Sequence, residues 1–175
     1  MLAYHGTLKS GLTQLTPFAN THSELQNACV YLTKSKVLAL LHIWDKPYRW
    51  IKFEYAQDGR IVYLESYPGA LEKFYGGVAG SIYSCEGKFK RLARNVLITR
   101  KAVDVIDEDY VPDALERILE YERQGLLEIR RYESLTEEER AREKRMILST
   151  IKNRQVDTAL MAFVREKFPA LRVAC

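Results

Sequence analysis

The chain has 175 residues, of which 47% are hydrophobic and 29% are charged, and its formal net charge is +4. These values fit a soluble globular protein with one substantial core. The mildly basic charge slightly favours anionic ligands. It is well short of the clustered Lys and Arg of a dedicated nucleic-acid binder, so nucleic acid is not an expected partner.

The cysteines and the apolar runs favour a cytoplasmic protein without a membrane anchor. Cys29, Cys85 and Cys175 are far apart and show no metal-ligand spacing, so neither a disulfide framework nor a metal site is expected. The first residues lack the charged region and following apolar region of a secretory leader, so secretion is not expected. The longest apolar run, residues 37–44, is interrupted by His42 and is too short to cross a bilayer.

The first part of the chain predicts two strands and a helix, joined by loops. The elements expected there are a strand over 2–7, a short element over 12–17 ended by Pro17, a surface loop over 20–27, a strand over 29–33 and a helix over 36–43. The helix is expected because Val37, Leu40 and Leu41 form an apolar stripe. Thr33 or Ser35 can cap its first turn.

The middle of the chain predicts mainly strands. The expected elements are an aromatic loop over 44–50, strands over 50–55 and 60–65, a short helix over 70–75, and strands over 81–86, 95–99 and 102–106. The pair Asp58-Gly59 between the first two strands is a preferred hairpin turn. A hairpin is therefore the most secure local prediction.

The last part predicts three helices and one strand. Pro112 is placed in the first turn of a helix that ends before Gly125, and a strand follows over 126–132. Ser134 and Glu137 predict a capping box for a long charged helix that reaches about residue 152. A final helix is expected over 156–168, ended by Pro169.

The opening run Tyr4-His5-Gly6-Thr7 and the later run Val30-Tyr31-Leu32-Thr33 together resemble the first two motifs of the ADP-ribosyltransferase superfamily, in its diphtheria-toxin-like and poly-ADP-ribose-polymerase-like branch. That branch has a strand with H-G-[ST], then a pair of aromatics with ten residues between them. Tyr31 fits the first aromatic place, and the second place holds His42 instead of tyrosine, with Trp44 two residues later.

The resemblance implies an α+β fold of split antiparallel sheets with NAD in the cleft between them, and no metal. The ADP-ribosyltransferase-like domain would comprise residues 1–133, with residues 134–175 as a helical extension packed on it. The chemistry of the residues agrees with such a ligand, because a main chain bared by Gly6 can pair with a carboxamide and His5 can bond a ribose hydroxyl. Thr7 completes the motif. Tyr31, with His42 or Trp44, can stack on a flat ring.

The third motif of that family is a catalytic glutamate near the start of a later strand. Residues 94–99 are the strand that aligns, and they offer Asn95 and no acid. Glu86 is the nearest carboxylate at a strand end. The sequence therefore leaves enzymatic activity open, and the two candidates for the catalytic place are Glu86 and Asn95.

Three functions follow from these residues. The first is an NAD-binding ADP-ribosyltransferase-like protein that transfers ADP-ribose or hydrolyses NAD. The second is a catalytically impaired nucleotide-binding module of the same fold. The third is an RNA 2′-phosphotransferase-like protein, since that family also begins with an H-G-T-like strand, although Tyr31 stands where its later motif has histidine. The acceptor group is not predicted.

Overall fold

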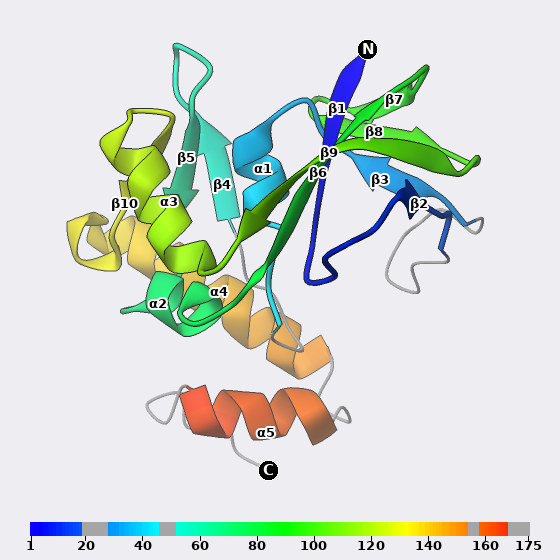
Figure 1. Ribbon diagram of the computed structural model, residues 1–175. Coiled ribbons are helices and arrows are strands. Elements are labelled where there is room, and N and C mark those ends of the chain that lie inside the picture. Colours follow the sequence, from blue (N-terminus) through cyan, green and yellow to red (C-terminus); the bar gives the residue numbers. More distant parts are fainter. Residues whose placement is uncertain (19–27, 46–51, 154–157, 168–175) are drawn as a thin grey trace. The chain divides into compact units, whose positions relative to one another are not determined.

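The computed structural model describes residues 1–18, 28–45, 52–153 and 158–167, and it has a mixed α+β fold (Figure 1). By its internal contacts the chain divides into two units. The first unit comprises residues 1–44 and 75–123, and the second comprises residues 45–74 and 124–175. This division differs from the expected boundary after residue 133. The reason is that the strand after residue 123 pairs in the second unit, with a strand of the predicted hairpin.

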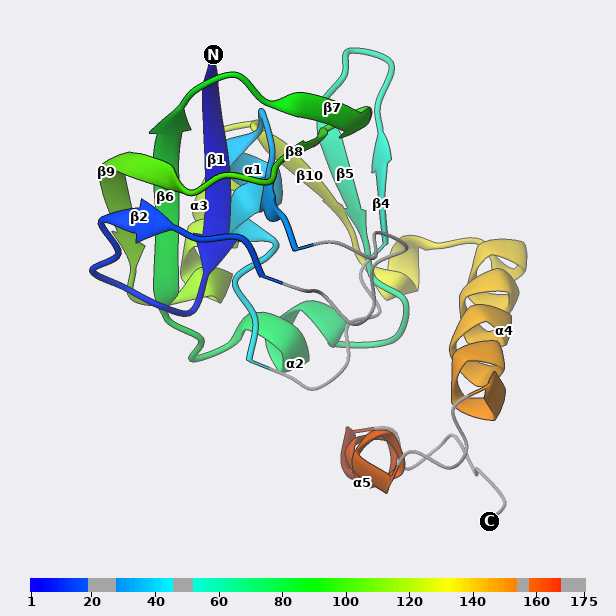
Figure 2. The same ribbon diagram turned by 90° about the vertical axis from the view of Figure 1, so that its right-hand side faces the viewer.

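The first unit contains two sheets, which are antiparallel throughout. The four-stranded sheet has, in spatial order, β1 (Leu2–Thr7), β6 (Gly80–Glu86), β9 (Val103–Val111) and β2 (Gln14–Leu15). The three-stranded sheet has β3 (Val30–Leu32), β8 (Val96–Thr99) and β7 (Lys90–Ala93). An isolated bridge between Tyr4 and Thr33 joins β1 to the chain just after β3. The two sheets thereby form one curled surface (Figure 2).

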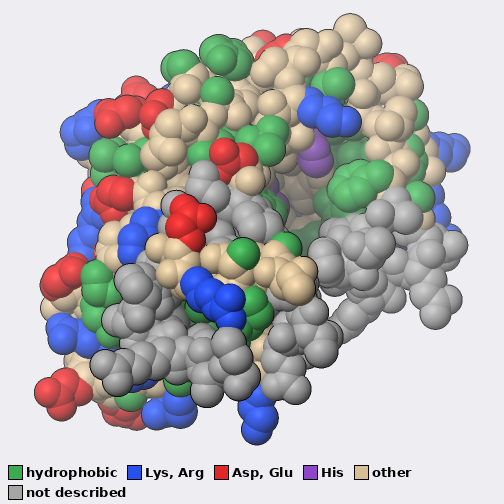
Figure 3. Space-filling model, turned by 90° about the horizontal axis from the view of Figure 1, so that it is seen from below, with side chains coloured by type: hydrophobic (Ala, Val, Ile, Leu, Met, Phe, Trp, Pro, Cys, Tyr) green, Lys and Arg blue, Asp and Glu red, His purple; other side chains and the backbone are tan. Residues whose placement is uncertain are grey.

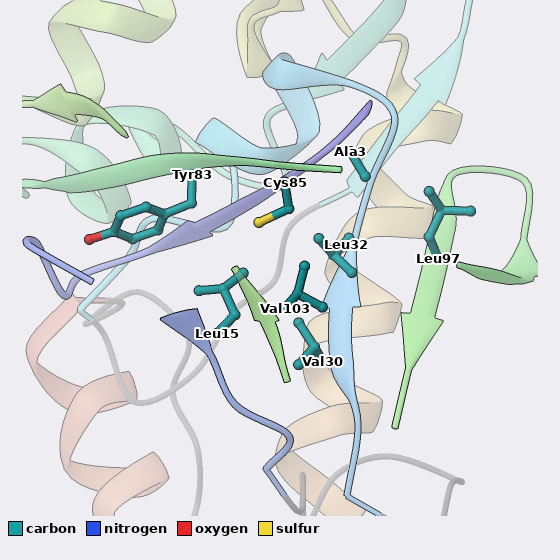
Figure 4. Packing of buried hydrophobic residues seen from close by; sticks show 8 residues of the cluster. All are labelled: Ala3, Leu15, Val30, Leu32, Tyr83, Cys85, Leu97 and Val103. Atoms are coloured by element: carbon teal, nitrogen blue, oxygen red, sulfur yellow. The ribbon is translucent and has the colours of Figure 1, made fainter. Parts of the chain in front are cut away.

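The core of the first unit lies inside this curl. Its buried side chains come from both sheets and point toward one another (Figure 4). They are Ala3, Leu15, Val30, Leu32, Tyr83, Cys85, Leu97 and Val103. Burial in this apolar layer raises the pKa of the Cys85 thiol to about 11, so this cysteine is a core residue and not a reactive thiol.

Two helices complete the first unit, and each begins at a side-chain cap. Helix α1 (Lys36–Leu40) begins at Ser35, one of the two predicted caps, whose hydroxyl accepts a hydrogen bond from Leu38 N at 3.3 Å. It ends three residues earlier than expected, so His42 lies beyond it. Helix α3 (Ala114–Arg123) is capped by Asp113, which accepts from Glu116 N. Pro112 therefore precedes the cap and is not in the first turn.

The second unit is built on the predicted hairpin. Strands β4 (Lys52–Tyr55) and β5 (Ile61–Leu64) are antiparallel, and Gly59 has a φ of +87° in the turn between them. Strand β10 (Leu127–Arg130) pairs parallel with β5. Helix α2 (Ala70–Tyr75) spans the division between the units. The remaining elements are a 3₁₀ turn, η1 (Tyr132–Ser134), and helices α4 (Glu137–Asn153) and α5 (Thr158–Lys167).

The capping box of α4 begins two residues later in the chain than predicted. Thr136 and Glu139 bond reciprocally, because Glu139 N donates to the Thr136 hydroxyl and Thr136 N donates to the Glu139 carboxylate. Ser134 instead lies in η1 and donates to the Arg131 carbonyl. Both pairs satisfy the same spacing rule, so the sequence pattern alone did not choose between them.

Two strands were incompletely predicted. Strand β7, in which two of the four residues are basic, was not expected, and β9 continues to Val111, five residues beyond the predicted end. The polar run 107–110 looks unlike a strand, yet its main chain pairs with β6. The expected loop 20–27, residues 46–50 of the aromatic loop, and the ends of the last predicted helix lie outside the described residues.

Candidate functional site

The sheets separate at a defined point next to Gly6. Tyr4 and Thr33 exchange both main-chain hydrogen bonds, Tyr4 N to Thr33 O at 2.7 Å and Thr33 N to Tyr4 O at 2.8 Å. Because main-chain groups alternate along a strand, the N–H and C=O of Gly6 face the same side as those of Tyr4, away from β6. Gly6 and Tyr31 would form the next pair, but no main-chain hydrogen bond joins them within the described residues.

The imidazole of His5 occupies this point of separation. Its Nδ1 lies 2.8 Å from the carbonyl oxygen of Tyr31. A carbonyl only accepts, so Nδ1 carries the proton and Nε2 presents a lone pair. Burial lowers the pKa of His5, and the hydrogen bond to Tyr31 opposes this only in part. His5 is therefore a neutral ring with a free acceptor nitrogen near neutral pH.

Gly6 also has a structural reason to be glycine. A Cβ placed on Gly6 would lie 1.8 Å from the carbonyl oxygen of Ala39 in α1. Helix α1 thus packs directly on the main chain of β1. Close packing explains the absence of a side chain at this position without any ligand, and the exposed main-chain edge of Gly6 is a separate feature.

The predicted aromatic residues lie on the elements around Gly6. The Tyr31 ring is half-buried, with its centroid 6.1 Å from that of Phe18. His42 N donates to Ala39 O, the atom that lies against Gly6, so His42 belongs to the turn that abuts β1. The His42 ring is exposed, its Nδ1 donates to Leu38 O at 2.6 Å, and its centroid lies 5.9 Å from that of the Trp44 ring.

The structure therefore places His5, Gly6, Tyr31 and His42 on adjoining elements, which are β1, β3 and the turn after α1. Seen from below, the surface has a recess in which a histidine side chain (purple) lies beside apolar side chains (green) (Figure 3). Thr7 has a local role, because its hydroxyl accepts from Lys9 N where the chain leaves β1.

The two predicted catalytic positions lie apart from His5. Glu86 is opposite Leu2 at the other end of the β1–β6 pair, and the alternation of β6 places it on the face opposite to that of His5. Asn95 lies in the turn between β7 and β8. Strand β8 pairs with β3, where Tyr31 is opposite Ile98, so the aligned strand is next to the Tyr31 strand.

One acid on the face of His5, Glu108, was not among the residues predicted from the sequence. In the sheet, His5 is opposite Tyr83 on β6, and Tyr83 is opposite Glu108 on β9. Directly opposed residues share a face, so these three side chains form a row across three strands. Glu108 is exposed, and it is the only carboxylate of β1, β6 and β9 in that row.

The Glu108 carboxylate is held by several donors. Gly11 N lies 3.0 and 3.1 Å from its two oxygens, the Ser81 hydroxyl 2.5 Å from Oε1, and the Tyr83 hydroxyl 3.1 Å from Oε1. The hydrogen bond from Ser81, followed by that from Gly11, lowers the pKa of Glu108. Glu108 is thus ionised, and it anchors the loop that follows β1.

A register shift explains why the sequence did not reveal Glu108. Strict alternation from Val103 would put residues 105, 107 and 109 on the inner face. The pairing of β9 with β6 shifts between Ser84 and Cys85, so that Val105 and then Glu108 face inward. No property of the local sequence marks this irregularity.

Among the described residues, no group of three or more His, Cys, Asp or Glu side chains could hold a metal ion. No helix in the described part of the chain is long and apolar enough to cross a membrane. No protein-family model, curated protein or solved structure matches the chain. The case for a function therefore depends on the geometry around Gly6.

Proposed function

We propose that the protein binds the nicotinamide end of NAD where β1 and β3 separate, and that the first unit is a divergent ADP-ribosyltransferase fold. The observation that carries the proposal is the main chain of Gly6, whose N–H and C=O face away from β6 at the end of the Tyr4–Thr33 bridge. A carboxamide needs one acceptor and one donor, and this edge offers both.

The neighbouring side chains fit the rest of that ligand. The lone pair on Nε2 of His5 can accept a hydrogen bond from a ribose hydroxyl, since Nδ1 is committed to Tyr31 O. The half-buried ring of Tyr31, with His42 or Trp44 from the chain after α1, supplies flat surfaces for stacking. These contacts would orient the nicotinamide and its ribose.

The reaction that such binding serves is cleavage of the bond between nicotinamide and ribose. Nicotinamide leaves with the bonding electron pair, and a hydroxyl of an acceptor or of water attacks the ribose carbon and loses its proton. A carboxylate stabilises the positive charge that develops on the ribose. Glu108 is favoured for this role over Glu86, because Glu108 lies on the face of His5 and Glu86 does not.

A second candidate function is a binding module that keeps the NAD site without transfer. Two observations favour it. Asn95 lies in the turn just before β8, the strand next to β3, and the resembled family has its acid near the start of a comparable strand. The carboxylate of Glu108 is already bonded to Gly11, Ser81 and Tyr83, so it is oriented toward the loop after β1.

Binding is tested by calorimetric titration with NAD. We expect a measurable heat for the wild type, and affinity reduced roughly tenfold or more by His5→Ala and by Tyr31→Ala. Phe53→Ala, which removes a partly exposed ring from the second unit, should bind as the wild type does. Absence of binding by the wild type, or equal affinities in all four proteins with unchanged melting temperatures, would rule the NAD site out.

Catalysis is tested separately by following nicotinamide release from labelled NAD. Release that is lost in Glu108→Gln and kept in Glu86→Gln assigns the acid to β9. Release that is lost only in Glu86→Gln contradicts that assignment. NAD binding without release in the wild type selects the binding module over the enzyme.

A further inference from the structure

The basic residues of this chain are concentrated around one hairpin. Residues 88–101 contain six Lys or Arg and no Asp or Glu. The rest of the chain has 21 basic and 23 acidic residues, a net charge of −2. The formal net charge of +4 therefore hides a strongly basic segment within an otherwise slightly acidic protein. We call this segment the basic hairpin.

The six cations of the basic hairpin are exposed to solvent. They are Lys88, Lys90, Arg91, Arg94, Arg100 and Lys101. The segment comprises β7, β8 and the residues just before and after them, and β7 is the edge strand of its sheet. Because Lys90 is opposite Ile98, Lys88 and Lys90 lie at the same end of the ribbon as Arg100 and Lys101.

All of these cations except Arg94 are without an ion pair in the part of the chain that the structure describes. Within the described residues, no carboxylate forms an ion pair with Lys88, Lys90, Arg100 or Lys101. Arg91 bonds only main-chain oxygens, those of Ala93 and Arg94. A dense set of exposed and uncompensated cations repels itself, so it fits a surface that meets a polyanion.

The other side chains of the hairpin indicate which polyanion it meets. Single-stranded nucleic acids are bound on exposed aromatic rings that stack with the bases. The only aromatic residue of the basic hairpin, Phe89, is partly buried against the core of the first unit. A four-residue two-stranded ribbon about 13 Å long, with cations and without stacking rings, fits the grooves and phosphates of a duplex.

We propose that the basic hairpin binds the phosphate backbone of a double-stranded nucleic acid, without sequence preference. This inference does not depend on the proposed NAD site, because none of its six cations takes part in that site. With about four phosphates contacted, the logarithm of the binding constant should fall with the logarithm of the salt concentration with a slope of about −3.6.

The test uses fluorescence anisotropy of a labelled 20-base-pair DNA duplex from 50 to 300 mM NaCl. We expect the double variant Lys88→Glu, Lys101→Glu to bind roughly tenfold or more weakly, with a slope smaller in magnitude by about 2. The matched control is Lys144→Glu, Arg145→Glu. It makes the same change in net charge at exposed positions of α4, and it should bind as the wild type does.

Four outcomes would overturn the proposal. They are no duplex binding by the wild type at 50 mM salt, equal weakening in the hairpin and control variants, tighter binding to the single strand of the same sequence, and tighter binding to phosphatidylserine vesicles than to the duplex. Melting temperatures equal to that of the wild type show that both variants are folded. Binding to the duplex that only the hairpin variant weakens supports the proposal.

Discussion

The imidazole of His5 and the main-chain carbonyl of Tyr31 are joined by a hydrogen bond of 2.8 Å, although 26 residues separate them in the chain. This bond is formed at the point where β1 and β3 cease to pair. It takes the place that a main-chain bond from Gly6 would have in a continuous sheet, so it both ends the ladder and fixes the orientation of the ring.

The buried state of His5 predicts a pH dependence of stability. Burial lowers the pKa of His5 below its ordinary value of 6.5, so the unfolded chain binds a proton more readily than the folded protein. The stabilisation is therefore complete above pH 6.5 and is lost as the pH falls through the folded pKa. Urea midpoints at pH 8 and pH 5 should show a smaller loss for His5→Asn than for the wild type.

Phe53→Ala provides the comparison for this measurement. It removes an exposed ring that carries no titratable group, so it should lose as much stability between the two pH values as the wild type does. If His5→Asn and the wild type lose stability in parallel, the titration of His5 does not contribute to the pH dependence of stability. The buried orientation of its ring, bonded to Tyr31 O, would then be wrong.

The packing of α1 on β1 predicts that Gly6→Ala is strongly destabilising. The added Cβ would lie 1.8 Å from Ala39 O, a main-chain atom that moves only with the whole helix. We expect a loss of about 3 kcal/mol in the free energy of unfolding. Gly77→Ala, at a φ of +71° with no atom within 4 Å of the added Cβ, should lose only about 1 kcal/mol. Equal losses in denaturant titrations would contradict the close contact.

The carboxylate of Glu108 predicts a second dependence of stability on pH, in the acidic range. Its hydrogen bonds with Ser81 and Gly11 lower its pKa below 4.5, so its stabilisation is present above that value and is lost as the pH falls through the folded pKa. Glu108→Gln should lower the melting temperature at pH 6 and should flatten the fall in melting temperature between pH 5 and pH 3.

Limited proteolysis gives an independent measurement of the same anchor. Since Gly11 N donates to Glu108, the variant should be cleaved faster near residues 8–13 than the wild type is. Asp107→Asn removes the neighbouring exposed carboxylate and should leave both the melting curve and the cleavage rate unchanged. Faster cleavage in both variants would indicate a general effect of charge and not the loss of the anchor.

In the second unit, the ion pair between Lys52 and Glu143 predicts that two substitutions, Lys52→Met and Glu54→Gln, cause unequal losses of stability. The Glu143 side chain is 2% exposed and its Oε1 lies 2.6 Å from Lys52 Nζ, whereas Lys52 is 24% exposed. Lys52→Met would leave a buried carboxylate with Arg142, at 3.5 Å, as its only charged partner among the residues that the structure describes. We expect a loss of about 2 kcal/mol in the free energy of unfolding.

Glu54 is the matched control because it pairs with the same lysine, at 3.7 Å, from a position that is 49% exposed. Glu54→Gln should change the free energy of unfolding by about 0.5 kcal/mol or less. Denaturant titration of the two variants measures both values. A loss for Glu54→Gln as large as that for Lys52→Met would show that burial of Glu143 does not set the response.

Local signals in the sequence predicted much of the fold. The turn residues Asp58-Gly59 predicted the hairpin of β4 and β5, and Ser35 predicted the start of α1. They succeeded because turns and caps depend on residues a few positions apart. The same logic failed for the start of α4, where two capping pairs satisfied one rule and only the surrounding structure selected Thr136 and Glu139.

The sequence by itself determined the residue types near the candidate site, the strand that carries Tyr4 to Thr7, the strand that carries Tyr31 and the helix that follows it. The tertiary structure alone decided that His5 bonds to Tyr31, that Gly6 presents its main chain at a separation of two sheets, and that Glu108 shares the face of His5. The physical reason is that pairing register and strand irregularities depend on partners far away in the chain. No local pattern of residues records them.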